Sequence, residues 1–99
     1  MCYTYILYSK STDTFYKGST QNLQERLRRH NGKFEKATKL GTPWILLWHI
    51  QKATKGEAQI LEYKIKNLSR KRTCEFMLKY DEGIGGPDEL LLIKQLSGC

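Results

Sequence analysis

The distribution of apolar side chains near the N-terminus predicts two strands joined by a turn. Residues 3–8 are rich in Tyr, Ile and Leu, and residues 15–19 begin with Phe and Tyr. The residues between them include Ser, Thr and Asp, which favour turns. We therefore expect a hairpin over residues 3–19, in which residues two apart share a face.

A helical period follows the hairpin. Asn22 is a favoured N-cap residue, and two leucines four residues apart mark the buried side of the helix that it opens. Gly32 is expected to end this helix. Arg26 and His30 then lie one turn apart, beside the apolar stripe.

The rest of the chain contains one more strand and further helices. The dense apolar run over residues 43–50 predicts a third and more central strand. After it we expect a helix from Thr54 or Gly56 to about Leu68, a basic break over 69–72 and a helix over 73–80. A glycine-rich linker over 81–87 and a short C-terminal helix or tail over 88–96 should follow.

The order strand, strand, helix, strand, helix, helix predicts an α+β fold. We expect a small three-stranded antiparallel sheet flanked by helices, much like an α/β sandwich. The chain of 99 residues suffices for one small domain. We place that domain at residues 1–80 and assign residues 81–99 to a glycine-rich linker with a short C-terminal helix or tail.

Composition narrows the functional class. No apolar run reaches the roughly 18 residues that span a membrane, and the N-terminus lacks the layout of a signal peptide, so we expect a cytoplasmic protein without a membrane partner. Three cysteines at spacings unlike any zinc pattern indicate reduced thiols. A net charge of +7, from 17 Lys and Arg against 10 Asp and Glu, favours a polyanionic partner.

Several short motifs resemble those of the GIY-YIG endonuclease family, above all its small stand-alone bacterial domains, which resemble the N-terminal domain of an excision-repair nuclease. The resemblance covers roughly residues 2–80. It rests on Tyr3-Thr4-Tyr5, Tyr16-Lys17-Gly18, Arg26, His30 and Glu62. The first motif departs from the family pattern because it reads Tyr-Thr-Tyr in place of Gly-Ile-Tyr, and a further Asn found in some relatives has no clear counterpart, which bears on substrate handling.

The resemblance implies a GIY-YIG-like fold and a set of catalytic positions. Tyr5 and Tyr16 match the tyrosines of the two motifs, and Gly18 matches the glycine of the second. Arg26 matches the helix arginine, His30 the residue one turn later, and Glu62 the glutamate that ligates a single Mg²⁺ or Mn²⁺ ion.

These residue types suit hydrolysis of a phosphodiester, which needs an activated water and neutralised phosphate charge. Arg26 would clamp the phosphate with its planar fork. Either tyrosine would orient the water or take its proton, and the sequence does not rank the two. His30 would share the proton transfer or bind phosphate. This chemistry requires that all five side chains gather in one concavity.

Each of these residues has an ordinary structural explanation when taken alone. A tyrosine in a sheet is more often structural, and a surface arginine or histidine is more often solvated. Glu62 is spaced to pair with Lys66 one turn later. Only the joint pattern favours catalysis.

Basic residues around these positions are candidates for contacts with DNA or another nucleic acid. Contacts of this kind bind phosphate without reading sequence, so we expect weakly specific or structure-preferring cleavage by a monomer or weak dimer. The candidates are Gly18 and the basic residues Lys17, Arg28, Arg29, Lys33, Lys36, Lys39, Lys64, Lys66, Arg70, Lys71 and Arg72.

Two other functions remain open at this point. One is a nucleic-acid-binding module of the same fold that does not cleave. The other is a small protein-interaction domain that uses Trp44 and Trp48, or the leucine-rich tail over 90–96, although core packing is the simpler role for the tryptophans.

Overall fold

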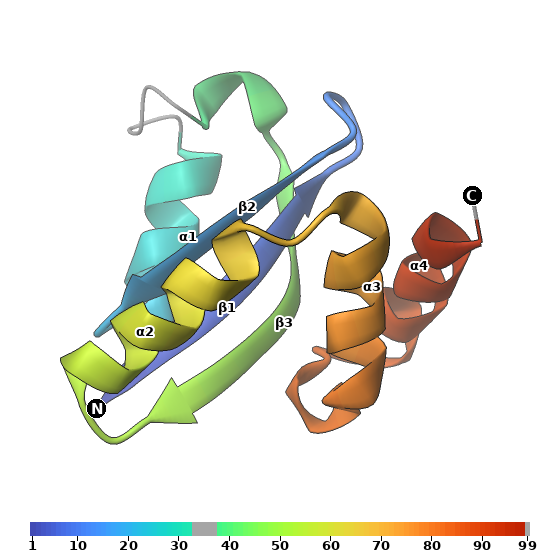
Figure 1. Cartoon of the computed structure of the whole chain (residues 1–99). Helices are drawn as coiled ribbons and strands as arrows, with labels where there is room; N and C mark the ends of the chain where they lie inside the picture. The colour runs from blue at the N-terminus through green and yellow to red at the C-terminus, as the bar shows by residue number, and fades with distance from the viewer. Residues whose placement is uncertain (33–37, 99) are drawn as a thin grey trace.

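The computed structural model describes residues 1–32 and 38–98. Its elements are β1 (Cys2–Ser9), β2 (Thr14–Thr20), α1 (Leu23–Asn31), the 3-10 helix η1 (Lys39–Gly41), β3 (Trp44–Lys52), α2 (Lys55–Lys66), α3 (Arg70–Lys79), the 3-10 helix η2 (Asp81–Gly83) and α4 (Pro87–Ser97). Figure 1 shows α1 behind the sheet, and α2 and α3 in front of it. The expected α+β class with a three-stranded antiparallel sheet is confirmed.

The strand order of the sheet is β2-β1-β3, with β1 paired to a neighbour on each side. The prediction that residues 43–50 form the more central strand is therefore wrong, because β3 lies at an edge. Its apolar character has another cause: the chain after α3 covers that edge. Ile84 bridges to Trp48, and the Gly85 N–H donates to the Leu47 carbonyl at 3.0 Å.

A β-bulge adjusts the pairing of β1 with β3. Ile6 lies opposite Trp48, whereas Leu7 lies opposite Leu46, so Leu47 is the extra residue. A bulge lets two successive side chains reach the same face. Leu47 and Trp48 accordingly both join the same core cluster, and both are almost fully buried.

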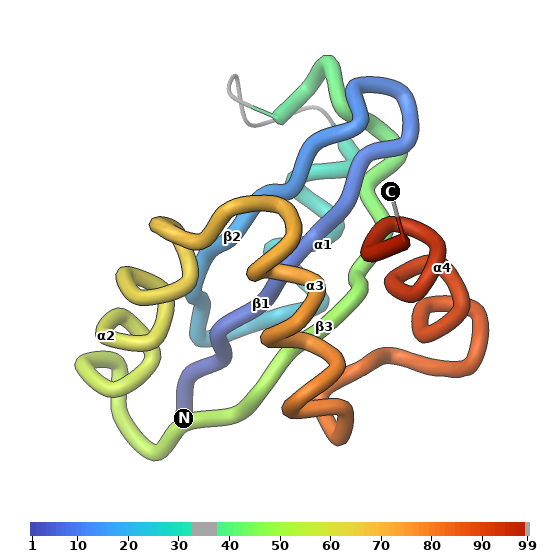
Figure 2. Tube along the Cα trace, turned by 45° about the vertical axis from the view of Figure 1, so that its right-hand side comes forward, coloured from blue at the N-terminus to red at the C-terminus, as the bar shows by residue number. Residues whose placement is uncertain are grey.

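Two hydrophobic clusters hold the layers together, one on each face of the sheet. The larger lies under α2, α3 and α4 and is centred on Ile6, Leu47, Trp48, Ile65, Met77 and Ile93. The smaller lies under α1 and contains Tyr5, Leu7, Trp44 and the partly buried Tyr16, Leu23, Leu27 and Leu46. Figure 2 shows the resulting arrangement, with α2, α3 and α4 together on the near side of the strands.

The helices differ from expectation at two places, and the first is the predicted linker over 81–87, whose residues 81–83 form η2. A basic break was predicted over 69–72, but α3 already begins at Arg70, because the Ser69 hydroxyl accepts the Arg72 N–H and caps the first turn. Near the C-terminus, Ile93 and Leu96 of α4 are buried in the larger cluster, so residues 87–97 pack on the same core as the strands. Within the described ranges, no helix has the length and apolar character needed to cross a membrane.

Helix α2 allows the core to be tested with a matched pair of isoleucines. Ile65 is 1% exposed and packs on the sheet, whereas Ile60 is 62% exposed on the same helix. We expect Ile65→Ala to lower the free energy of unfolding by about 2–5 kcal/mol, because it leaves a cavity. Ile60→Ala should change it by less than about 0.5 kcal/mol. Urea unfolding followed by circular dichroism measures both, and equal losses would contradict the packing described.

Candidate active site

Tyr5 and Gly18 lie opposite each other on β1 and β2. The Tyr5 ring occupies the space in which a side chain at position 18 would stand: a Cβ on Gly18 would lie 2.7 Å from the Tyr5 hydroxyl oxygen. Glycine is needed here because of this close approach. Tyr5 itself is 1% exposed, so its hydroxyl must find a partner inside the protein.

His30 provides that partner. It lies in the last turn of α1 and is completely buried. Its Nε2 atom is 3.1 Å from the Tyr5 hydroxyl, and its Nδ1 atom is 2.9 Å from the Thr38 hydroxyl. Helix α1 brings His30 to this place because Asn22 caps its first turn by accepting the Glu25 N–H. A continuous polar chain therefore runs from β1 through α1 to the segment before β3.

Tyr16 packs beside this chain without joining it. Its ring centroid is 4.7 Å from that of His30 and 6.4 Å from that of Tyr5. Tyr16 is only partly buried, and its hydroxyl makes no hydrogen bond to another residue of the described chain. Of the two candidate tyrosines, Tyr16 therefore has the freer hydroxyl group.

Arg26 lies on α1 one turn before His30 and acts on the same phenol. Burial raises the pKa of the Tyr5 hydroxyl to about 12, while hydrogen bonding and positive charge from Arg26 lower it. Electrostatic interaction of the Tyr5 phenolate with Tyr16 and with Glu62 acts in the opposite direction and raises the pKa of Tyr5. Tyr5 consequently stays protonated at neutral pH, as the donor or acceptor of a fixed hydrogen bond.

Glu62 approaches from the other face of the sheet. It lies on α2, where its Oε1 atom accepts the Ser19 hydroxyl at 2.6 Å and its Oε2 atom is 2.7 Å from the Lys66 ammonium. Ser19 follows Gly18 on β2, so its side chain points away from the tyrosines. The five candidate residues are thus divided between the two faces of the sheet beside β2, which is an edge strand, and do not gather in the single concavity expected from the sequence.

The surroundings of Glu62 fit a hydrated divalent ion. The carboxylate is 18% exposed and lines a surface hollow of about 530 Å³ together with the side chains of Gln59, Tyr63, Lys66 and Asn67. Among residues 1–32 and 38–98, no three His, Cys, Asp or Glu side chains form a complete metal cage. A single accessible carboxylate suits Mg²⁺, which keeps most of its water ligands.

The basic residues named from the sequence lie in different environments. Lys17 points inward: its ammonium donates to the Thr73 hydroxyl at 2.8 Å and to the Leu68 carbonyl at 3.4 Å, and burial lowers its pKa. Arg28 pairs with Glu25, and Arg70 pairs with Asp13. Exposed on the surface are Arg29, Lys39, Lys64, Lys71 and Arg72. Lys33 and Lys36 lie outside the described residues.

Two partners of the candidate residues escaped prediction from sequence. Ser19 holds the Glu62 carboxylate, and strand alternation could have placed it on the face opposite Gly18. Thr38, eight residues further along the chain, forms a hydrogen bond with the His30 ring, and no local sequence pattern predicts this contact.

Comparisons with known proteins agree with the motifs. A family model described as the GIY-YIG catalytic domain matches residues 1–75. A UPF0213 protein of Staphylococcus haemolyticus is 38% identical over 76 residues, which cover 76% of this chain and 92% of that protein. A UPF0213 protein of Bacillus pumilus is 43% identical over 72 residues, or 71% of each chain. The solution NMR structure of a UPF0213 protein from Bacillus halodurans is 35% identical and superimposes with a TM-score of 0.52, covering 90% of this chain and 92% of that one.

Gly18 provides a test of the packing around Tyr5. In Gly18→Ala the new methyl group must displace the Tyr5 ring, so we expect a loss of about 1–3 kcal/mol in the free energy of unfolding. Gly56→Ala is the matched control, because a Cβ there would meet only the Thr54 hydroxyl oxygen at 4.0 Å. That variant should gain up to about 1 kcal/mol. Urea denaturation measures both, and a shift in the same direction for the two variants would contradict the close approach.

Proposed function

Because the chain belongs to the family of GIY-YIG catalytic domains, we propose that it is a divalent-metal-dependent endonuclease that hydrolyses phosphodiester bonds in DNA. The family implies a nuclease that binds nucleic acid. The observation that carries the proposal is that all five motif positions hold the expected residue type, with Tyr5, Tyr16, Arg26 and His30 on one face of the sheet and Glu62 beside β2 on the other. The reduced thiols of Cys2 and Cys74 suit a cytoplasmic location.

In this proposal Glu62 would hold one Mg²⁺ or Mn²⁺ ion, which supplies Lewis-acid charge at the scissile phosphate. Lys66 would release the carboxylate when the ion binds. This exchange costs little, since the Lys66 side chain is 54% exposed and an ion pair at the surface contributes at most about 1 kcal/mol. The Ser19 hydroxyl can keep its hydrogen bond, because a carboxylate oxygen accepts more than one partner.

Tyr16 is the better candidate for handling the proton of the attacking water. Its hydroxyl has no other partner among the described residues, and its ring is only partly buried. The Tyr5 hydroxyl is buried and already bonded to His30, and the raised pKa of Tyr5 makes deprotonation harder. A base must reach the proton it takes, so access favours Tyr16.

Arg26 and His30 have different parts in this scheme. Arg26 is half-buried as a residue, and its guanidinium would neutralise charge on the phosphate in the transition state. His30 is fully buried, so we assign it to positioning: it holds the Tyr5 hydroxyl in place and forms the wall against which Tyr16 packs.

The exposed cations would hold the nucleic-acid backbone without reading bases. This supports weakly specific or structure-preferring cleavage. A non-cleaving binding module is the second candidate function, and the ion pair between Glu62 and Lys66 is the observation that favours it, because that contact occupies the carboxylate without any metal.

The proposal is tested by incubating the protein with nicked, branched and single-stranded DNA, in Mg²⁺, Mn²⁺ or EDTA. Wild type should give products only with metal, and Glu62→Gln should lower the rate by about 10²-fold or more, because the neutral amide is a poor ligand for Mg²⁺. Glu57→Gln, an exposed position on the same helix, serves as the control and should keep full activity. The same products from wild type and Glu62→Gln would refute the proposal; salt-dependent binding without products would favour the binding module.

Tyrosine-to-phenylalanine variants separate the two phenols. We expect Tyr16→Phe to lower kcat by about 10²–10⁴-fold, the usual contribution of a positioned acid or base. Tyr5→Phe should have the smaller effect on kcat and the larger effect on stability, because it removes the buried hydrogen bond between the Tyr5 hydroxyl and His30 Nε2. Single-turnover rates and urea midpoints measure both, and the reverse order of rates would make Tyr5 the base.

A further inference from the structure

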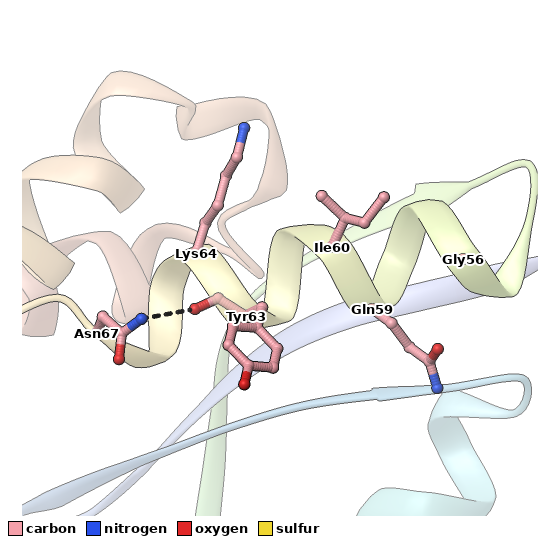
Figure 3. A pocket seen from close by; sticks show the side chains of 6 residues that line it. All are labelled: Gly56, Gln59, Ile60, Tyr63, Lys64 and Asn67. Atoms are coloured by element: carbon pink, nitrogen blue, oxygen red, sulfur yellow. Dashed lines mark hydrogen bonds between the residues drawn. The ribbon is translucent and has the colours of Figure 1, made fainter.

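Helix α2 carries an aromatic side chain that the mechanism does not use. Tyr63 is 77% exposed, although it follows Glu62 directly in the sequence. Figure 3 shows its ring and the Gln59 side chain extending in one direction from the helix, with Ile60 and Lys64 extending in the other. A large aromatic ring left this open on a rigid helix adds nothing to the core and needs another explanation.

Tyr63 stands between two hollows on this surface. One, of about 560 Å³, is lined by Gly56, Gln59, Ile60, Tyr63, Lys64 and Asn67. The other, of about 530 Å³, is lined by Gln59, Glu62, Tyr63, Lys66 and Asn67. Gln59, Tyr63 and Asn67 line both hollows. Glu62, which carries the candidate metal-binding carboxylate, therefore lines one of the two hollows together with Tyr63.

The groups around the ring are those that bind nucleotides. Lys64 and Lys66 both follow Tyr63 on α2 and are exposed, and each lines one of the two hollows with Tyr63. The Asn67 amide donates to the Tyr63 backbone carbonyl at 3.4 Å, which holds the amide at this turn of α2. Aromatic rings with neighbouring cations bind single strands by stacking on bases and attracting phosphates. These two lysines suit a polyanion better than an apolar protein surface.

We propose that Tyr63 is a stacking platform for an unpaired base of the nucleic acid, next to the scissile phosphate. The inference rests on the proposed function in naming that phosphate, and it adds a substrate class: DNA with an unpaired stretch at the cleavage site. Gln59 and Asn67 offer amide groups to the stacked nucleotide, while Lys66 moves from Glu62 to a phosphate when the strand binds.

Binding without cleavage tests this assignment. Fluorescence anisotropy in EDTA and low salt would measure Kd for a labelled oligothymidylate about 12 nucleotides long and for a duplex of equal length. Tyr63→Ala should weaken single-strand binding by about 5- to 150-fold, the range for loss of one stacked base. Tyr63→Phe, which keeps the ring, should stay within about twofold of wild type, as should duplex binding by every variant.

Leu91→Ala is the matched control, because Leu91 is 58% exposed on α4, away from α2. Thermal unfolding establishes that each variant folds. The inference is overturned if Tyr63→Ala binds the single strand as Leu91→Ala does, if duplex binding falls equally, or if wild type binds no single strand. It is also overturned if Tyr63→Ala only disrupts a dimer seen in sedimentation, since the ring would then contact a second copy of this chain and not a base.

The two proposals can fail separately. Binding of single strands that depends on Tyr63, together with no metal-dependent products, would keep the stacking platform and refute the nuclease. Cleavage that depends on Glu62, together with unchanged binding by Tyr63→Ala, would keep the nuclease and refute the platform.

Discussion

The pairing of β1 with β2, which sets Gly18 against the ring of Tyr5, is the constraint on which the candidate site depends. Only a residue without a side chain leaves room for that ring. With the ring in place, its hydroxyl reaches His30, and His30 reaches Thr38. A buried polar chain of this kind is stable only when every member has a partner. The contacts between the sheet and α1 therefore depend on the absence of a Cβ at position 18.

The central strand also holds the opposite helix. Thr4 is fully buried on the other face of β1, and its hydroxyl donates to the Ala58 carbonyl of α2 at 2.8 Å. Consecutive residues of one strand, Thr4 and Tyr5, thus fix α2 and α1 relative to each other. The position of Glu62 with respect to the tyrosines follows from this arrangement, because α2 cannot move along the sheet without breaking a buried hydrogen bond.

Because β2 is an edge strand, residues on its two faces both lie near the same edge of the sheet. Residues on opposite faces of a central strand would be separated by the neighbouring strands, whereas at an edge they approach each other around a single strand. Lys17 does not compete for this space, because its ammonium is held inside by Thr73 and Leu68. Exposed edges invite pairing with other chains, and charged or twisted edges reduce that risk. A polyanion lying along this edge would meet the arginine from one side and the glutamate from the other.

Local pattern determined much of this protein: the hairpin, the cap at Asn22, the buried stripe of α2 and the motif residues all follow from neighbours within a few positions. Tertiary structure alone decided which strand is central, because the strand order depends on backbone pairing between distant segments. The apolar side chains of β3 could be buried at an edge, since the chain after α3 covers that edge. It also decided that Glu62 meets Ser19, a contact between residues 43 apart in sequence. It distinguished Tyr5 from Tyr16 as well, because burial and hydrogen bonding depend on what the rest of the chain packs against each ring.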